Sequence, residues 1–181
     1  MRQSFRQLAR VEKAHGRRGE VVAVPVDGLP CYLRPGMTVW AVPPPLKAPR
    51  RLRVQGLRGD GEGRLVSFAG VGDIDAASAY VGTTLLAATD DLPADFWLHD
   101  ARTLVGRPVR DLRRGDVGNI VEVMRGVAND GWVVRGPDGD LLVAVVDEQV
   151  VGIDEGGVVV VRLPADARAA TPGEDEEVSG S

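Results

Sequence analysis

Apolar and polar residues alternate in several short runs of the first half of the chain, a period typical of half-buried β-strands. The runs and their bounding turn residues predict strands at 20–26, 38–42, 51–55, 64–68 and 84–88. Pro25 has no backbone N–H, so we expect the first of these strands to end there or to lie at an edge. Five strands joined by tight turns favour a small closed barrel, because closure leaves no exposed edges.

One short helix is predicted before the last of these strands. Asp73 is a good N-cap, since its side chain can accept from the first-turn N–H groups of a helix over residues 75–80. Gly82 suits the position just after the helix.

The second half repeats the strand pattern. Strands are expected at 108–111, 117–124, 132–135, 140–146, 150–154 and 158–163, with a hairpin turn at 136–139. The predicted fold is therefore all-β: two small β-barrels joined by a short linker, with one helix in the first. The expected domain bounds are 1–90 for the first barrel, 91–96 for the linker, 97–165 for the second barrel and 166–181 for a disordered acidic tail.

Composition narrows the class of protein. Aromatic residues make up only 4% of 181 residues, so both cores must be mainly aliphatic. No run approaches the about 20 apolar residues of a membrane helix, and no secretory signal is visible. The single cysteine, Cys31, excludes an internal disulfide framework. We expect a cytoplasmic, monomeric protein with no membrane partner.

The net charge of −4 conceals an uneven distribution. Residues 1–92 carry 13 basic and 9 acidic side chains, whereas residues 93–165 carry 8 basic and 12 acidic ones. The basic excess is densest near the start of the chain and suggests a patch that faces a polyanion. Most basic residues are Arg, which contacts phosphate well, but GC-rich coding also favours Arg over Lys, and both explanations stay open.

Catalytic and cofactor signatures are missing from the sequence. It has no P-loop, dinucleotide-binding glycine motif, HExxH motif or nucleophile elbow. The two histidines, His15 and His99, are far apart, and no further ligands indicate a metal site. Asp90 and Asp91 are interpreted as solvated linker residues and Cys31 as a structural thiol. We therefore expect a protein that acts without catalysis, cofactor or metal.

Two segments are candidate binding sites. The first is His15-Gly16-Arg17-Arg18-Gly19, where two glycines allow a tight turn that presents both arginines to phosphate. The alternative is that His15 and Glu20 merely satisfy the hydrogen-bonding groups of the turn, and that Arg17 and Arg18 are solvated. The second is Phe96-Trp97, whose side chains would point to opposite sides of an extended chain and contact a partner, or else hold the two units together.

Four motifs occur in the order and spacing of a known family. They are Val11 to Val21 (VEKAHGRRGEV), Gly70 to Gly82 (GVGDIDAASAYVG), Asp91-Leu92-Pro93, and Leu104 to Asp111 (LVGRPVRD) followed by Val117 to Val123 (VGNIVEV). With Phe96-Trp97 and Asn129-Asp130, these motifs resemble the bacterial RimM family of ribosome maturation factors, and the last is similar to the PRC-barrel. The resemblance covers about residues 9–164.

The resemblance implies an assembly factor that binds the immature small ribosomal subunit near its head and assists late assembly and 16S rRNA processing. Its implied partners are 16S rRNA and the nineteenth protein of the small-subunit series, the latter bound through the second barrel. An acidic second barrel suits a basic ribosomal protein, and a basic first barrel suits RNA. The alternatives are a PRC-barrel adaptor for a non-ribosomal protein, and a small-molecule-binding barrel or unrecognised enzyme.

Overall fold

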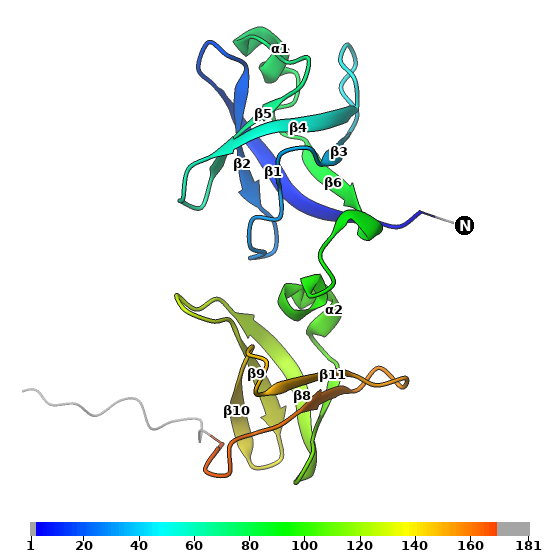
Figure 1. Ribbon diagram of the computed structural model, residues 1–181, viewed down its shortest axis with the longest axis vertical. Coiled ribbons are helices and arrows are strands. Elements are labelled where there is room, and N and C mark those ends of the chain that lie inside the picture. The colour runs from blue at the N-terminus through cyan, green and yellow to red at the C-terminus, as the bar shows by residue number, and fades with distance from the viewer. Residues whose placement is uncertain (1–2, 170–181) are drawn as a thin grey trace, which may run out of the picture. The chain divides into compact units, whose positions relative to one another are not determined.

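The computed structural model describes residues 3–169, which form parts of two compact units divided between Phe96 and Trp97. Both units are built from β-strands, with a few short helices (Figure 1). No helix among the described residues is both long and apolar enough to cross a membrane. The mainly-β prediction is confirmed, and each unit is described by itself below.

The first unit is a closed six-stranded barrel with strand order β1-β2-β5-β4-β3-β6. Its strands are β1 (Phe5–His15), β2 (Glu20–Pro25), β3 (Thr38–Val42), β4 (Arg51–Arg58), β5 (Arg64–Phe68) and β6 (Thr84–Ala88). Alternate residues fill the interior, as Leu52 and Val54 of β4 illustrate. The core is aliphatic apart from Phe68, Tyr80 and Phe96. The five predicted strands and the closure are confirmed, and β2 ends at Pro25.

The sequence pattern does not predict β1, the longest strand of the first unit. Its alternation is interrupted by irregular pairing between Gln7 and Ala9 and again between Val11 and Lys13. Leu8 and Ala9 are consequently both buried although they are neighbours in sequence. Since a period-two pattern fails at each bulge, the segment stands out in the sequence only for its basic residues.

The predicted helix is confirmed as α1 (Ile74–Ser78). Asp73 is its N-cap and accepts from the backbone N–H of Ala76 at 2.8 Å. The expected role of Gly82 is wrong in detail, because the helix ends at Ser78 and Ala79 is its C-cap. Gly82 instead lies at positive φ in the turn into β6 and donates its N–H to the carbonyl of Val11.

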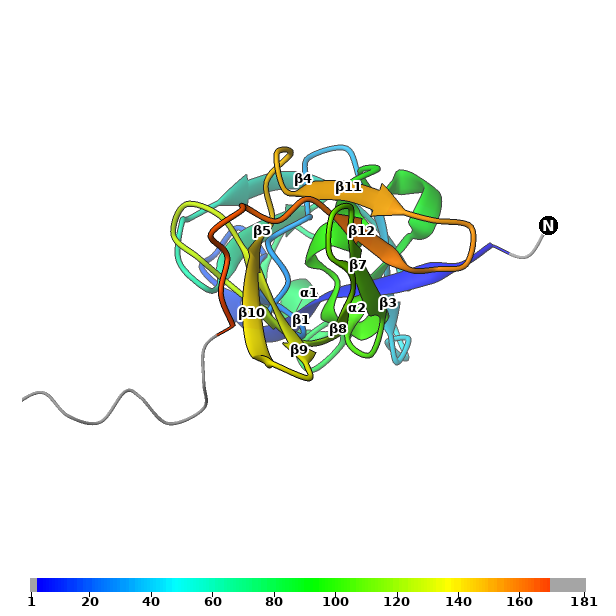
Figure 2. The same ribbon diagram turned by 90° about the horizontal axis from the view of Figure 1, so that it is seen from below.

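The second unit is a six-stranded sheet with order β10-β9-β8-β7-β12-β11. Its strands are β7 (Pro108–Asp111), β8 (Gly115–Met124), β9 (Gly131–Gly136), β10 (Gly139–Ala144), β11 (Val150–Ile153) and β12 (Val159–Val161). Figure 2 shows β9 beside β10, an antiparallel pair, and β7 beside β12, a parallel pair. All six strands match predicted runs. The first sheet closes on itself, whereas the hydrogen-bonded order of this sheet begins at β10 and ends at β11.

Three short helical turns lie between β6 and β7 and were not predicted. They are the 3₁₀ helices η1 (Thr89–Asp91) and η2 (Phe96–His99) and the helix α2 (Ala101–Leu104). Asp100 caps α2 by accepting from the N–H of Arg102. Elements of three or four residues are too short for an apolar period to form, so the pattern carried no signal for them.

The predicted tail begins inside the described part of the chain. Ala167 and Ala169 pack against the core of the second unit. The guanidinium of Arg114 donates to the carbonyl oxygens of Pro164, Ala165 and Ala167. Residues up to 169 therefore contact this unit, and the remaining expected tail residues, 170–181, lie outside the described residues.

The carboxylate of Asp111 joins the turn after β7 to the segment after β12. One oxygen accepts from the N–H groups of Arg113 and Arg114 at 3.0 and 2.8 Å. The other accepts from the N–H of Leu163 at 2.7 Å. Burial by itself raises the pKa of Asp111, but the hydrogen bonds from Leu163, Arg114 and Arg113 outweigh it and lower the pKa below its ordinary value.

We predict that Asp111→Asn destabilises the second unit by about 1–3 kcal/mol near neutral pH, because the amide NH₂ replaces one accepting oxygen and turns a donor toward a backbone donor. The pKa of the folded carboxyl lies below the unfolded value of about 3.9, so its stabilisation is complete above that pH. It is lost as the pH falls through the folded pKa. Urea unfolding at several pH values, followed by tryptophan fluorescence, measures the difference.

The matched control is Asp116→Asn, whose side chain is 83% exposed. We expect the control to change the free energy of unfolding by less than about 0.5 kcal/mol. A difference between wild type and Asp111→Asn that persists unchanged well below the unfolded pKa would contradict the role given to this carboxylate.

Candidate functional site

The predicted basic loop is the tip of the hairpin between β1 and β2. His15 ends β1, and His15, Gly16, Arg17 and Arg18 are all exposed. Gly16 and Gly19 have φ of +67° and +75°, which glycine adopts readily. The turn geometry expected from the two glycines is therefore present, and it leaves both arginine side chains on the surface.

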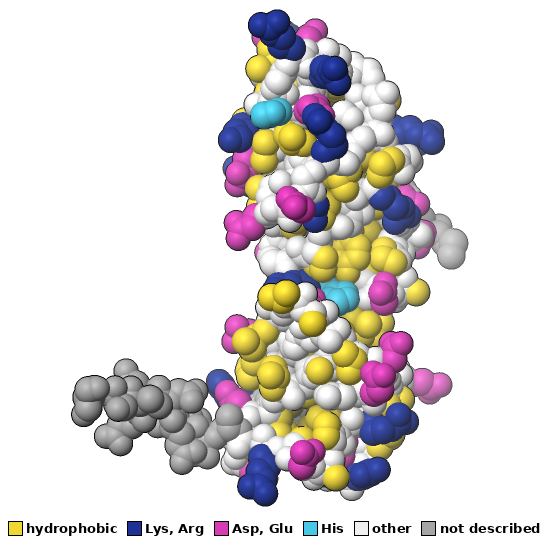
Figure 3. Space-filling view, turned by 60° about the vertical axis from the view of Figure 1, so that its left-hand side comes forward, with side chains coloured by type: hydrophobic (Ala, Val, Ile, Leu, Met, Phe, Trp, Pro, Cys, Tyr) yellow, Lys and Arg dark blue, Asp and Glu magenta, His cyan; other side chains and the backbone are white. Residues whose placement is uncertain are grey.

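Gly19 fixes the position of this hairpin tip. It is buried, and a Cβ added there would lie 2.7 Å from the backbone nitrogen of Asp73 and 2.8 Å from the carbonyl oxygen of Val71. The backbone of the loop thus lies directly against the segment that begins α1. Figure 3 shows basic side chains gathered over the end of the first unit, with acidic ones among them.

The side chain of Glu20 contacts a different strand of the barrel. Its carboxylate accepts from the guanidinium of Arg58 on β4, with contacts of 2.6 and 3.1 Å. This hydrogen bonding, followed by the charge of Glu20, raises the pKa of Arg58. The negative charge of Glu20 therefore faces Arg58 on another strand of the barrel wall, while its backbone pairs with His15 across the turn.

Phe96 and Trp97 pack into different units. Phe96 is 7% exposed, belongs to the first core and meets the ring of Tyr32 edge-on at 4.8 Å. Trp97 packs against the second core, with its ring 6.1 Å from that of Trp132. The pair lies in the 3₁₀ helix η2, so the expectation of an extended segment is wrong.

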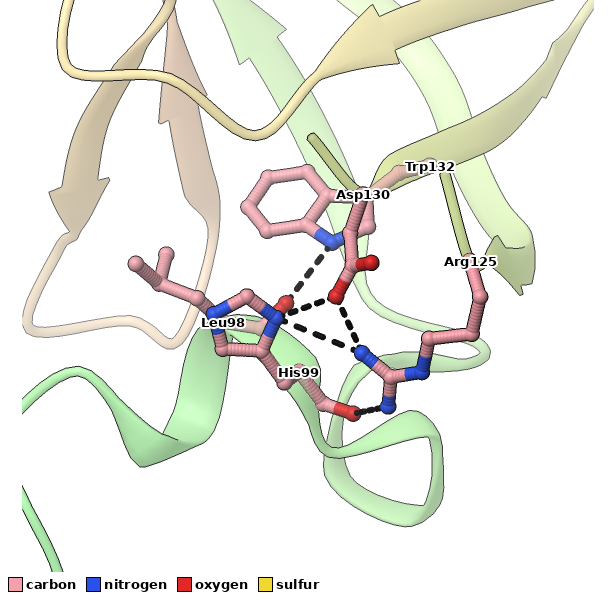
Figure 4. Close-up of polar contacts among 5 residues, drawn as sticks. All are labelled: Leu98, His99, Arg125, Asp130 and Trp132. Atoms are coloured by element: carbon pink, nitrogen blue, oxygen red, sulfur yellow. Dashed lines mark hydrogen bonds and ion pairs between the residues drawn. The ribbon is translucent and has the colours of Figure 1, made fainter. Parts of the chain in front are cut away.

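A polar cluster in the second unit could not be read from the sequence (Figure 4). The carboxylate of Asp130 contacts both Nδ1 of His99 and the guanidinium of Arg125. Arg125 also donates to the carbonyl oxygen of His99 at 2.8 Å, and Nε1 of Trp132 donates to that of Leu98 at 3.0 Å. These bonds attach η2 to the segment around the start of β9.

The cluster is a structural anchor rather than a recognisable catalytic arrangement. His99 and Asp130 are 31 residues apart, so no spacing rule could have paired them, although Asn129-Asp130 is one of the family-like motifs. Cys31 is partly buried against the first core, in keeping with a structural thiol. Within residues 3–169, no three His, Cys, Asp or Glu side chains gather so that they could hold a metal ion.

Comparison with known proteins gives consistent matches. Residues 7–92 match the family model of the RimM N-terminal domain. Ribosome maturation factor RimM of Nocardioides sp. is 33% identical over 179 residues, which cover 94% of this chain and 96% of that protein. The protein of the same name from Rubrobacter xylanophilus is also 33% identical, over 87% of this chain and 93% of its own length.

Two solved structures are also similar. The putative 16S ribosomal RNA processing protein RimM of Pseudomonas aeruginosa is 22% identical, with a TM-score of 0.43 over 90% of this chain and 99% of that one. The N-terminal domain of RimM from Thermus thermophilus is 24% identical, with a TM-score of 0.39 over 51% of this chain and 96% of that one.

The fold and the family match define a class of protein, one with two β units of which the first is a RimM N-terminal domain. The alignments with the Nocardioides and Rubrobacter proteins, each 33% identical, cover nearly the whole of each sequence. The chain belongs to the RimM family.

We predict that Gly19→Ala destabilises the first unit more than Gly16→Ala does. Both residues have positive φ, so alanine costs about 1–2 kcal/mol at either position. At Gly16 a Cβ meets nothing within 4 Å, whereas at Gly19 it meets backbone atoms, which adds about 1–3 kcal/mol. Urea unfolding of the two variants tests this, and equal destabilisation would show that the hairpin does not lie against Asp73.

We predict that Phe96→Ala lowers the free energy of unfolding of the first unit by about 3–5 kcal/mol, since it empties a buried site. Phe96→Leu is the control and should cost less, because it refills part of the volume. If Phe96→Ala had the same free energy of unfolding as the wild type, the Phe96 ring would not belong to the core.

Proposed function

We propose that this protein is a ribosome maturation factor that binds the immature small ribosomal subunit. On this proposal it assists late assembly and 16S rRNA processing by binding alone, without catalysis. The observation that carries the proposal is the nearly end-to-end similarity to the ribosome maturation factor of Nocardioides sp.. Charge and surface features of the two units support the finer assignments.

The hairpin tip His15-Gly16-Arg17-Arg18-Gly19 is the proposed rRNA contact. Arg17 and Arg18 are exposed on a turn whose backbone Gly19 holds against the start of α1. A fixed backbone lowers the entropy lost when two long side chains settle on phosphates. The pairing of Glu20 with Arg58 also turns the carboxylate that follows the tip in sequence toward a cation of the barrel itself. Both features favour a polyanionic partner.

The second unit is the proposed site for a basic protein, the nineteenth of the small-subunit series. Acidic residues outnumber basic ones between residues 93 and 165, which gives charge complementarity to such a partner. Several apolar side chains of this unit are exposed, among them Leu142 at 64% and Val151 at 51%. Trp97 is half-buried, so part of its ring can still contribute to a partner contact.

We predict that Arg17→Gln with Arg18→Gln weakens co-sedimentation with free small subunits and flattens its salt dependence. Removing each phosphate contact should reduce the slope of log affinity against log salt by about one. The measurement is sucrose-gradient sedimentation with small subunits, large subunits and joined ribosomes at two salt concentrations.

The control removes two exposed arginines of the second unit, in Arg162→Gln with Arg168→Gln. It should leave the salt slope near that of the wild type. An unchanged slope in the hairpin variant would remove Arg17 and Arg18 from the RNA contact. Absence of wild-type binding to small subunits at low salt would overturn the proposed function and favour an adaptor for a non-ribosomal protein.

A further inference from the structure

An apolar groove lies on the outer wall of the first barrel, at the opposite end of β1 from the hairpin tip. Its volume is about 250 Å³, less than that of a typical drug-sized ligand pocket. Its main lining residues are Phe5, Trp40, Val42, Pro44, Arg50 and Leu86. A groove of this size suits one flat group rather than a folded surface.

Strand register explains how the groove forms. Gln7 of β1 is paired with Leu86 of β6, which is paired with Trp40 of β3. Trp40 is in turn paired with Arg51 of β4. Directly paired residues point to the same face of a sheet, so these four side chains form one row across four strands. Because the flanking residues Val39, Ala41 and Leu52 are buried, this row lies on the outside.

The aromatic floor of the groove is held in place. Phe5 meets Trp40 edge-on, with ring centroids 4.9 Å apart, and is itself 39% exposed. The guanidinium carbon of Arg51 lies 5.9 Å from the centre of the Trp40 ring. A half-buried indole already fixed by two neighbours loses little freedom when a further ring stacks on it.

One side of the groove is basic, whereas Asp90 and Asp91 follow the end of β6 that pairs with Phe5. Residues 38–58, which supply β3, β4 and the loop between them, contain five basic side chains and no acidic one. Arg50 lines the groove and Arg51 lies beside Trp40. An apolar peptide in the groove would remove water from these two guanidinium groups without giving them a hydrogen-bonding partner. Phosphates, in contrast, would pair with them.

We propose that this groove binds an unpaired nucleobase of single-stranded RNA, which stacks on Trp40 while the neighbouring phosphates contact Arg50 and Arg51. Stacking platforms beside positive charges are how proteins hold single strands without reading their sequence. The choice of RNA rests on the proposed function. Phe5 and His15 are the two ends of β1, so the groove lies roughly 30 Å along the barrel wall from the hairpin tip.

The test uses the full-length protein and a fluorescein-labelled oligouridylate of about ten nucleotides, a length within the range that such sites cover. Fluorescence anisotropy should show that Trp40→Leu weakens binding about 5- to 150-fold, because leucine keeps an apolar surface but offers no ring. Trp40→Phe should retain most of the affinity. An RNA duplex of the same length should bind the wild type and Trp40→Leu alike.

Arg51→Gln should weaken oligouridylate binding and lower its salt slope by about one, whereas Arg162→Gln should not. Urea unfolding verifies that each variant is folded. If a variant at Trp40 unfolds, Arg51→Gln and Phe5→Leu carry the test, since both side chains are exposed. Equal oligouridylate affinity in wild type, Trp40→Leu and Arg51→Gln would overturn the proposal.

Small-subunit sedimentation separates this proposal from the proposed function. Loss of oligouridylate binding in Trp40→Leu supports the groove whether or not the wild type sediments with small subunits. Full oligouridylate binding by Trp40→Leu, together with normal sedimentation of the wild type, would overturn the groove and leave the proposed function standing. Equal weakening in Trp40→Leu and Trp40→Phe would also overturn stacking as the mode of binding.

Discussion

Closure of the first barrel by β1 is the constraint on which its surface features depend. This strand pairs with β2 along its second half and with β6 along its first half, so the sheet has no free edge. The two irregular pairings bend it enough to satisfy both neighbours. One end of the strand leads into the hairpin tip, and the other supplies Phe5 to the groove. Both proposed RNA contacts therefore rest on one strand.

The second unit holds its ends by carboxylates instead of closure. Asp111 binds the segment after β12, and Asp130 binds η2 through His99. Each carboxylate contacts more than one group while largely removed from water. Removing that of Asp111 would leave the N–H groups of Arg113, Arg114 and Leu163 without this acceptor. An open sheet fixed in this way keeps β10 and β11 as edge strands. The closed sheet of the first unit has no such edge strands.

Regular elements were predictable and irregular ones were not. Strands such as β3, β5 and β6 follow their apolar pattern to the residue, and Asp73 caps α1 as its sequence context indicates. The bulged β1 breaks the period on which the prediction relies. Within the candidate site, the glycine pattern indicated the turn at His15–Gly19, but nothing local links Gly19 to Asp73. The contacts of Glu20 and His99 likewise depend on residues brought close only by folding.

A net negative chain can still present a surface for RNA, because the charge that a phosphate meets is local. At physiological ionic strength the screening length is about 8 Å, so charges farther away contribute little. Residues 38–58 form a stretch without acidic side chains, and Glu20 is paired with Arg58. The electrostatics of the first barrel are thus set by its own arginines and not by the total of −4. On the proposed function, the opposite net charges of the two units suit one unit to RNA and the other to a basic protein.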